Sequence, residues 1–326
     1  MPNSTPKATP IRPLPAGPPV PVLAALLLAL LPLLAATGLP AQDRVALERD
    51  GFPMAFQNGP RVVTFDRQPS RILALGLGAS ELLVELGLGD LVVGRTLEWP
   101  GAEPLPRYAQ ALSRIPEVDQ GGLLLAETQD GGPDFVFGAF GPSTPEPAFL
   151  KTYRTLAGDK DQFFGEVKDL ARLFKVEAQA MAFLDEQERR LAALSSRLAQ
   201  ADRVGVLVIW DFNGGSLATA GGPDFATDLL RLAGARNVFA DLGPAPRPGA
   251  GEAAARDPSY VLLVDDGRGP LSAKLGALRG DPVLSGLGAL EQDRLLVLDG
   301  AYLLPGPRLA ETAELLARLF HPSLAD

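Results

Sequence analysis

The spacing of hydrophobic and polar positions divides the chain from residue 46 to the C-terminus into three stretches. Short apolar runs bounded by glycine, proline or polar residues predict strands, and apolar residues three or four apart predict helices. The first stretch predicts strands at Ala46–Asp50, Arg61–Phe65, Arg71–Leu75, Leu91–Gly94 and Asp134–Gly138. Between two of them, Glu81–Leu86 has helical spacing, with Ser80 as the expected N-cap. Strands alternating with helices indicate an α/β lobe with a mainly parallel sheet.

The middle stretch, from Asp161 to about Ala201, contains no proline and has apolar residues at helical spacing. The expected stripes are Phe163, Val167, Leu170 and Phe174, then Met181, Leu184, Leu191, Leu194 and Leu198. Val176–Ala199 alone would form a helix of about 35 Å. We expect this helix to bridge two lobes. The alternative is an ordinary long core helix of one large domain.

After Asp202 the α/β pattern returns. It predicts strands at Val204–Trp210, Tyr260–Val264 and Arg294–Leu298, and helices at Asp224–Ala233 and Leu309–Phe320. The segment Gly243–Gly251 is rich in proline, glycine and alanine and predicts a loop. Two similar halves on either side of one helix place a ligand cleft between them.

The first 41 residues have the composition of a secretory signal peptide. Lys7 and Arg12 are their only charges, and an apolar run from Val20 to Leu34 ends in small residues. This layout predicts cleavage after Gly38 or Ala41. The alternative is an uncleaved membrane anchor, because the apolar stretch is nearly long enough to span a bilayer.

Composition excludes several classes of function. The chain has 326 residues, a net charge of −9 and no cysteine. An acidic chain without a basic run argues against a nucleic-acid partner, and the absence of cysteine excludes disulfides and thiolate chemistry. No cysteine follows the signal to carry a lipid, so we expect a periplasmic protein.

The expected domains are a signal peptide at 1–41, an N-terminal lobe at 42–158, a helical segment at 159–201 and a C-terminal lobe at 202–326.

Several segments resemble the ferric-siderophore, haem and cobalamin receptors of ABC importers. In the first lobe they are Pro69–Leu75, Gly78–Leu83, Leu86–Asp90, Arg114–Val118 and Pro133–Gly138. In the second lobe they are Ala233–Asp241 (AGARNVFAD), Arg256–Leu262 and Pro305–Arg308. The similarity runs from about residue 61 to residue 322, in the order and spacing of that family.

The resemblance implies two Rossmann-like α/β lobes with mainly parallel sheets, joined by one long α-helix. It also implies a monomer without enzymatic activity or an intrinsic cofactor, which delivers a small-molecule metal chelate to a permease driven by an ATPase.

Members carry a glutamate on each lobe that docks on the permease, seven residues before a proline. Here Glu127 and Glu252 lie six residues before Pro133 and Pro258. They are either docking residues or ordinary solvated glutamates. The loop Pro142–Thr155 is short for the family.

Ligands of α/β proteins bind beyond the carboxyl ends of the strands. The side chains expected there are Ser80, Arg95, Trp99, Phe140, Trp210, Phe212, Tyr302 and Arg308. Aromatic walls suit a bulky organic complex, and Arg95 and Arg308 can pair with carboxylates or an oxidised catechol. The alternatives are a surface salt bridge or helix cap for the arginines and a core position for the tryptophans.

The single histidine limits the choice of ligand. His321 ends the last predicted helix, and receptors for bare zinc or manganese need clustered histidines with carboxylates. Haem iron would need Tyr302 or Tyr108 as its ligand. A ferric siderophore brings its own iron ligands, so it is the expected cargo, with cobalamin and haem as alternatives.

The sequence contains few residues that could support an enzymatic function. Gly76–Ser80 has two glycines of a dinucleotide fingerprint, but Glu81 stands where the third belongs. Without cysteine, and with one histidine near the end of the chain, nucleophilic catalysis lacks its base. Asp265 and Asp266 suggest a secreted carboxylate-dependent hydrolase, although adjacent strand residues point to opposite faces. A surface adhesion or scaffold protein is the third class.

Overall fold

The computed structural model describes residues 51–97, 99, 101–118, 132–139 and 150–324. The predicted signal peptide, the strand expected at Ala46–Asp50 and the candidates Phe140 and Glu127 lie outside these residues. In the described part of the chain, no helix combines the length and hydrophobicity that crossing a bilayer requires. The domain boundaries at residues 158 and 201 stay a prediction.

The N-lobe contains a four-stranded parallel sheet in the order β4-β3-β5-β6. Its strands are β3 (Ile72–Leu75), β4 (Val92–Arg95), β5 (Phe135–Gly138) and β6 (Lys151–Arg154). Every residue of β3 and β5 is buried, as expected for strands covered on both faces. Three strands agree with the prediction to within a residue. The fourth, β6, has one aromatic residue among three polar ones, so no apolar run predicts it.

An antiparallel hairpin precedes this sheet. It pairs β1 (Met54–Asn58) with β2 (Arg61–Phe65) across a two-residue turn. The bounds of β2 are as predicted, but its partner is β1, for which no strand was predicted. The Gln57 side chain stabilises the turn, because its amide donates to the carbonyls of Gly59 at 2.6 Å and Arg61 at 3.0 Å.

The helices of the N-lobe are α3 (Leu77–Glu85) and α4 (Pro106–Leu112), which contact each other. The predicted N-cap is wrong: α3 begins directly after Gly76, a position with φ of 96° that favours glycine. Ser80 lies inside the helix and is fully buried. Its hydroxyl donates to the Gly76 carbonyl at 2.7 Å.

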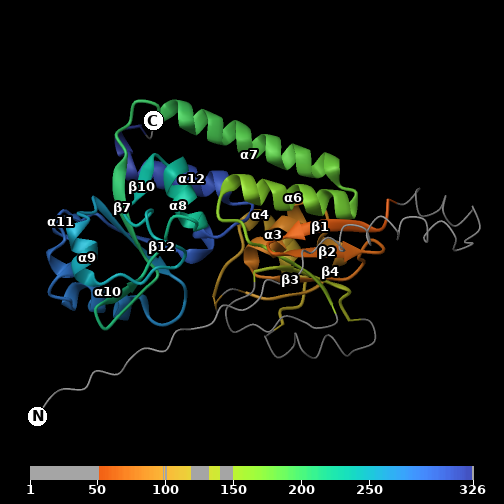
Figure 1. Ribbon diagram of the computed structural model, residues 1–326, viewed down its shortest axis with the longest axis horizontal. Helices are drawn as coiled ribbons and strands as arrows, with labels where there is room; N and C mark the ends of the chain where they lie inside the picture. Colours follow the sequence, from red (N-terminus) through yellow and green to blue (C-terminus); the bar gives the residue numbers. More distant parts are fainter. Residues whose placement is uncertain (1–50, 98, 100, 119–131, 140–149, 325–326) are drawn as a thin grey trace, which may run out of the picture. The chain divides into compact units, whose positions relative to one another are not determined.

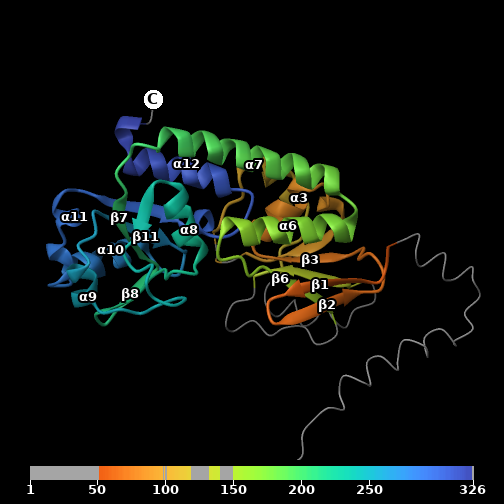
Figure 2. The ribbon, with the colours of Figure 1, turned by 45° about the horizontal axis from the view of Figure 1, so that its top comes forward.

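The middle stretch forms two helices that pack side by side, α6 (Lys160–Phe174) and α7 (Glu177–Arg197) (Figure 1, Figure 2). Asp159 caps α6 by accepting a hydrogen bond from the Gln162 amide at 2.8 Å. The α6 stripe is buried as predicted. The α7 stripe is wrong at Met181, which is 62% exposed. Ala180 and Phe183 face the core instead, because three- and four-residue spacing fits either neighbouring register.

The C-lobe repeats the parallel arrangement, with a sheet in the order β10-β7-β11-β12. Its strands are β7 (Val204–Ile209), β10 (Ala235–Asn237), β11 (Tyr260–Asp265) and β12 (Leu295–Asp299), and a hairpin pairs β8 (Asp211–Asn213) with β9 (Ser216–Ala218). Its helices are α8 (Phe225–Leu232), α9 (Ala250–Ala255), α10 (Leu271–Gly280), α11 (Gly288–Glu291) and α12 (Leu309–Phe320). Short 3₁₀ turns lie at Gly89–Leu91, Leu284–Gly286, Gly300–Leu303 and Pro322–Leu324. The bounds of α12 are as predicted, and the three predicted strands and α8 agree within a residue.

The long helix α7 connects the two lobes. It contacts α6 at the N-lobe and α12 near the C-terminus, and it leads directly into β7 (Figure 1). Arg190 of α7 forms two hydrogen bonds with Glu314 of α12, at 2.7 and 3.0 Å. The expected fold class, two α/β lobes joined by one long helix, is confirmed.

A buried ion pair also joins the lobes. Arg308, directly before α12, donates to Glu81 of α3 through Nε at 2.9 Å and Nη2 at 2.7 Å. The two side chains are 5% and 0% exposed. Glu81 further accepts the Leu105 amide at 2.7 Å. A pair so far removed from water is stable only while both partners are present.

Close backbone contact surrounds this ion pair. A Cβ on Gly78 of α3 would lie 2.5 Å from the carbonyl oxygen of Pro305, so the two chain segments approach as closely as glycine permits. One hydrophobic core cluster includes residues of both sheets, among them Ile72 of β3 and Val206 of β7. The lobes therefore share a packed and polar joint in addition to α7.

Candidate ligand-binding cleft

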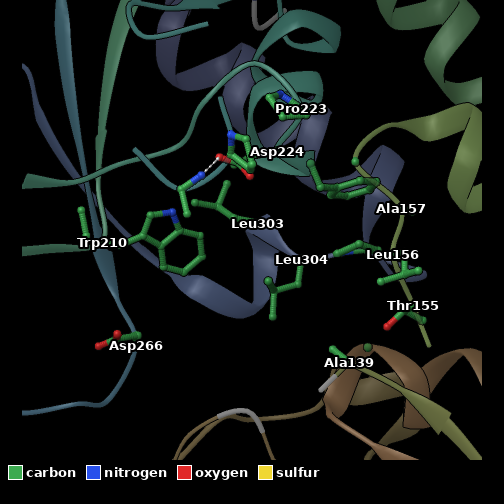
Figure 3. Close-up of a pocket in the computed structure, with 18 of the residues that line it drawn as sticks. Ala139, Thr155, Leu156, Ala157, Trp210, Pro223, Asp224, Asp266, Leu303 and Leu304 are labelled. Carbon is green, nitrogen blue, oxygen red and sulfur yellow. Dashed lines mark hydrogen bonds between the residues drawn. The ribbon is translucent and has the colours of Figure 1, made fainter. Parts of the chain in front are cut away.

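A cleft with a volume of about 670 Å³ is lined by segments from both lobes. One wall is Thr155–Gly158, directly after β6, and the opposite wall includes Trp210 and Asp266, directly after β7 and β11 (Figure 3). Leu303–Pro305 line the space between them. All these segments follow the carboxyl ends of parallel strands or lead into a helix, which is where α/β proteins bind ligands.

Two tryptophans from different lobes meet in the cleft. Trp99 and Trp210 both line it. A Cβ on Gly300 would lie 2.8 Å from Cη2 of Trp99 and 3.0 Å from Cζ3 of Trp210. The two indole rings therefore converge above a residue that has no side chain. Trp99 is only 7% exposed and belongs to the core cluster, so the partly buried Trp210 gives the cleft most of its aromatic surface.

The C-lobe wall is fastened by Lys274 of α10. Its Nζ donates to Asp266 Oδ1 at 2.6 Å and to the carbonyls of Val264 at 3.0 Å and Trp210 at 3.3 Å. The Lys274 side chain is only 11% exposed. An ammonium group has three donors, so every donor is used. This lysine joins the end of β11 to the segment after β7 and compensates the buried Asp266 carboxylate.

The N-lobe wall is fastened by Glu166 of α6. Its Oε1 accepts the Leu156 amide at 2.6 Å. Burial of this carboxyl group raises its pKa to about 7, although the Leu156 and Ala157 amides act in the opposite direction and Asp169 adds to the rise. The carboxyl group that holds this wall therefore stays protonated to a higher pH than an exposed glutamate does.

Asp211 of β8 also lines the cleft, and the other charged groups of the cleft lie on C-lobe loops. The Asp224 carboxylate accepts hydrogen bonds from the Gly221 amide and from the Ala245 amide, the latter at 3.2 Å, and so holds one loop against another (Figure 3). Arg268 is exposed, and its Nε lies 3.5 Å from Asp266 Oδ2. Arg247 is also exposed at the cleft. The cations available to a ligand are therefore exposed, whereas Asp266 is buried.

The structure places the predicted site residues in different surroundings. Trp99 and Trp210 line the cleft. Phe212 packs against the C-lobe core, and the Tyr302 ring lies 5.0 Å from Arg308 Cζ. Arg95 Nη2 lies 3.4 Å from Glu117 Oε2. Phe212, Tyr302 and Arg95 are not among the described residues lining the cleft.

Two of the predicted ligand contacts need correction. Ser80 has no exposed surface, because its hydroxyl is directed at the backbone of its own helix. Arg308 is buried against Glu81 and the Glu103 carbonyl, so its guanidinium joins the lobes and does not reach a ligand. Tyr108, considered as a haem ligand, is buried with its hydroxyl donating to Glu85.

The residues that fasten the walls are absent from the sequence-based site. Lys274 and Glu166 lie in helices, where a charged residue usually faces solvent, and no local pattern separates them from their neighbours. Asp266 was considered only as half of a carboxylate pair. In the structure Asp265 accepts the Gly267 amide at 3.2 Å and Asp266 pairs with Lys274, so the two carboxylates have separate partners.

The remaining candidates are placed outside the cleft. Glu252 of α9 forms an ion pair with Arg256 at 3.0 Å, one helical turn away. His321 follows α12, with Nε2 3.2 Å from the Gly234 carbonyl oxygen, which supports a role at the helix end. Among the described residues, no group of three or more histidine, aspartate or glutamate side chains is placed to hold a metal ion.

Comparison with known proteins shows that most of this chain is similar to one protein family. A family model described as periplasmic binding protein matches residues 72–302. A periplasmic binding protein from Veillonella parvula has a TM-score of 0.70 at 19% identity, covering 82% of this chain and 97% of its own. An ABC-type Fe3+-hydroxamate transport system from Saccharomonospora viridis has 0.69 at 23%, covering 83% and 99%.

A third structure is more similar in sequence. A periplasmic heme binding protein from Pseudomonas aeruginosa is 26% identical, with a TM-score of 0.64, and the likeness covers 78% of this chain and 94% of that one. Curated protein sequences give no match. The likeness covers nearly the whole length of these solved structures, so it extends over both lobes.

Proposed function

This chain belongs to the periplasmic binding protein family, and we propose that it binds a ferric-siderophore-type iron complex in the cleft between its lobes. Proteins of this family are substrate-binding proteins of ABC-type transport, and the absence of enzymatic activity is part of the proposal. The resemblance noted in the sequence is thus confirmed. The partners are the permease and ATPase of an importer. Export by a cleaved signal peptide and a monomeric state remain part of the proposal.

The composition of the cleft carries this proposal. Trp99 and Trp210 offer aromatic surface, and the described lining residues include no histidine, tyrosine or methionine. These side chains and cysteine, which the chain lacks, are the usual protein ligands of haem iron. A ligand that already satisfies its own iron fits such a lining. The volume of about 670 Å³ is in the range of sites for small organic molecules.

Haem is the second candidate, and cobalamin the third. The heme binding protein from Pseudomonas aeruginosa is the most similar in sequence of the three structures compared. Two converging indole rings also suit a flat macrocycle. Haem bound here would be held by stacking and by the exposed Arg247 and Arg268, which can pair with its propionates.

Fluorescence titration separates these ligands. The chain from about Gln42 onward would be titrated with a ferric trihydroxamate siderophore, its iron-free form, haemin and cyanocobalamin. Saturable quenching by the ferric siderophore, much weaker with the iron-free form, supports the proposal. Saturation by haemin or cobalamin alone keeps the transport role and changes the cargo. Trp99→Phe and Trp210→Phe should each remove part of the signal, because both rings line the cleft.

Docking on the permease is a separate proposal. We infer that Glu127 and Glu252 contact it, as the family resemblance implies. Glu252 is already paired with Arg256, so docking through Glu252 would compete with this ion pair. Glu127→Lys with Glu252→Lys should abolish uptake by cells while leaving ligand affinity unchanged. Glu291→Lys, an exposed change on α11, is the control. Normal uptake by the double variant would contradict the docking role.

A further inference from the structure

Glu166 is a buried carboxyl group directly behind the N-lobe wall of the cleft. The residue is 7% exposed. Oε1 accepts the Leu156 amide at 2.6 Å, and Oε2 is buried without a hydrogen-bond partner in the described part of the chain. A buried carboxylate oxygen normally has a donor, because leaving it without one costs much of its hydration energy. As a carboxylic acid, Glu166 keeps the bond to Leu156 and loses the charge.

The surroundings of Glu166 favour the neutral acid. Asp169 lies on the same helix and adds a repulsive negative charge, while its own carboxylate accepts the Tyr153 hydroxyl of β6 at 2.8 Å. The buried residues of α7, which packs against α6, are uncharged. Burial is the largest cause of the raised pKa of Glu166, about 7, and no cation contributes to that value. The ionised form of Glu166 therefore lacks a stabilising positive charge within the described chain.

The segment that Glu166 holds is exposed on the side of the cleft. Leu156 is 47% exposed, a large value for a leucine, and it lines the cleft together with Thr155, Ala157 and Gly158. The next residues are tied to the C-lobe, since the Lys160 amide donates to Asp228 of α8 at 2.8 Å. A ligand that covers Leu156 removes water from the outer side of this segment. The carboxyl group behind it then loses hydration, which disfavours its ionised form.

We propose that Glu166 is a positioning residue for the N-lobe wall and that this wall opens when Glu166 ionises, so that ligand binding draws a proton onto Glu166. The coupling of Glu166 protonation to ligand binding rests on the proposed function. The opening of the wall on ionisation of Glu166 does not. By linkage, a ligand that favours the protonated form binds less tightly as the pH rises. Affinity should fall about fivefold between pH 6 and pH 8 if binding raises the pKa by about one unit.

Hydrogen exchange of the ligand-free protein tests the wall. The amides of Leu156 and Ala157 would be followed from pH 6 to pH 8, with the β8–β9 hairpin as the internal reference for the pH dependence of exchange itself. Exchange at the wall should rise several-fold more than at the reference. Glu166→Gln keeps an acceptor for Leu156 and cannot ionise, so the excess should disappear. Asp161→Asn removes an exposed carboxylate of the same helix, and the excess exchange at the wall should persist in this variant.

Calorimetric titration at pH 7 tests the ligand part. The probes are the ferric trihydroxamate siderophore, haemin and cyanocobalamin, each in two buffers of different ionisation enthalpy. Proton uptake on binding should appear in the wild type and in Asp161→Asn, and vanish in Glu166→Gln. Equal proton uptake in all three proteins would overturn the coupling. If no probe binds, the proposed cargo fails, while an excess of exchange confined to proteins with Glu166 still supports the wall. Equal exchange with and without Glu166 overturns the inference whatever binds.

Discussion

The two walls of the cleft are built on similar sheets but are held by opposite kinds of group. Lys274 holds the C-lobe wall with three donors, each with a partner. Glu166 holds the N-lobe wall through one accepted hydrogen bond, while its other oxygen is without a partner in the described chain. A buried charge that is fully paired fixes its surroundings, whereas an incompletely paired one stays costly to ionise. Similar folds therefore give one firmly held wall and one adjustable wall.

Breaking the buried ion pair that joins the two lobes should cause the largest loss of stability. Arg308→Met leaves the Glu81 carboxylate buried without its cation, so unfolding should become about 3–5 kcal/mol easier. Urea denaturation measures this loss. Adding Glu81→Gln should recover a large part of it, because the stranded charge is gone. A loss of less than about 1 kcal/mol for Arg308→Met would mean that water reaches the pair.

Removing the C-lobe fastener should be the next largest change. Lys274→Met leaves the carbonyls of Trp210 and Val264 without this donor and Asp266 without its closest cation. We expect a loss of about 2–3 kcal/mol in the free energy of unfolding and weaker ligand binding, measured by denaturation and tryptophan fluorescence. Arg279→Met, at an exposed position of the same helix, is the matched control and should change neither. An equal loss in both variants would remove the special role of Lys274.

The N-lobe fastener should make stability depend on pH. The folded pKa of Glu166, about 7, lies above its ordinary value of 4.5, so between these values the folded protein binds more protons than the unfolded chain. Stability should then be greatest below pH 4.5, as far as this group is concerned, and fall by about 2–3 kcal/mol as the pH rises through 7. Glu166→Gln should remove this component. Identical pH profiles of unfolding for both proteins would show that Glu166 is not buried as described.

The smallest effect is expected far from both walls, at α9. Glu252→Gln breaks an ion pair with Arg256 that is partly exposed, with 46% of the Glu252 side chain and 24% of the Arg256 side chain accessible. Such pairs one turn apart contribute about 0.3–0.5 kcal/mol, and the loss should shrink further in high salt. Thermal unfolding at two salt concentrations measures it. A much larger loss would give Glu252 a structural role and weaken its case as a docking residue.

The sequence predicted the fold better than the site, for physical reasons. Strands such as β3 and β5 are buried on both faces, so their apolar runs are visible without knowledge of their neighbours. Short elements with mixed residues, such as β6 and the β8–β9 hairpin, give no such signal. The register of α7 was displaced at Met181 because a helical stripe constrains the spacing and not the face.

The site depends on partners that are distant in the chain. The rule that ligands bind at the carboxyl ends of strands placed Trp99 and Trp210 at the cleft, where both lie. Arg308 was expected there for the same reason, but its partner Glu81 lies 227 residues away in the sequence. The sequence alone does not show which charged residues are neutralised by an ion-pair partner, so Arg308 was predicted to be available to a ligand. Glu166 and Lys274 are concealed for a different reason, because Leu156 and Asp266 lie only 10 and 8 residues from them but come into contact only when each helix packs behind the end of its strand.

Gly300 makes the depth of this cleft easy to change during evolution. Its missing side chain is what lets the indoles of Trp99 and Trp210 approach each other. A single-base change converts any glycine codon into an alanine codon, and the added methyl group would lie 2.8 Å from Trp99 Cη2 and 3.0 Å from Trp210 Cζ3 and Val264 Cγ1, so these side chains would have to move. The packing of the two indole rings at this cleft therefore depends on one position without a side chain.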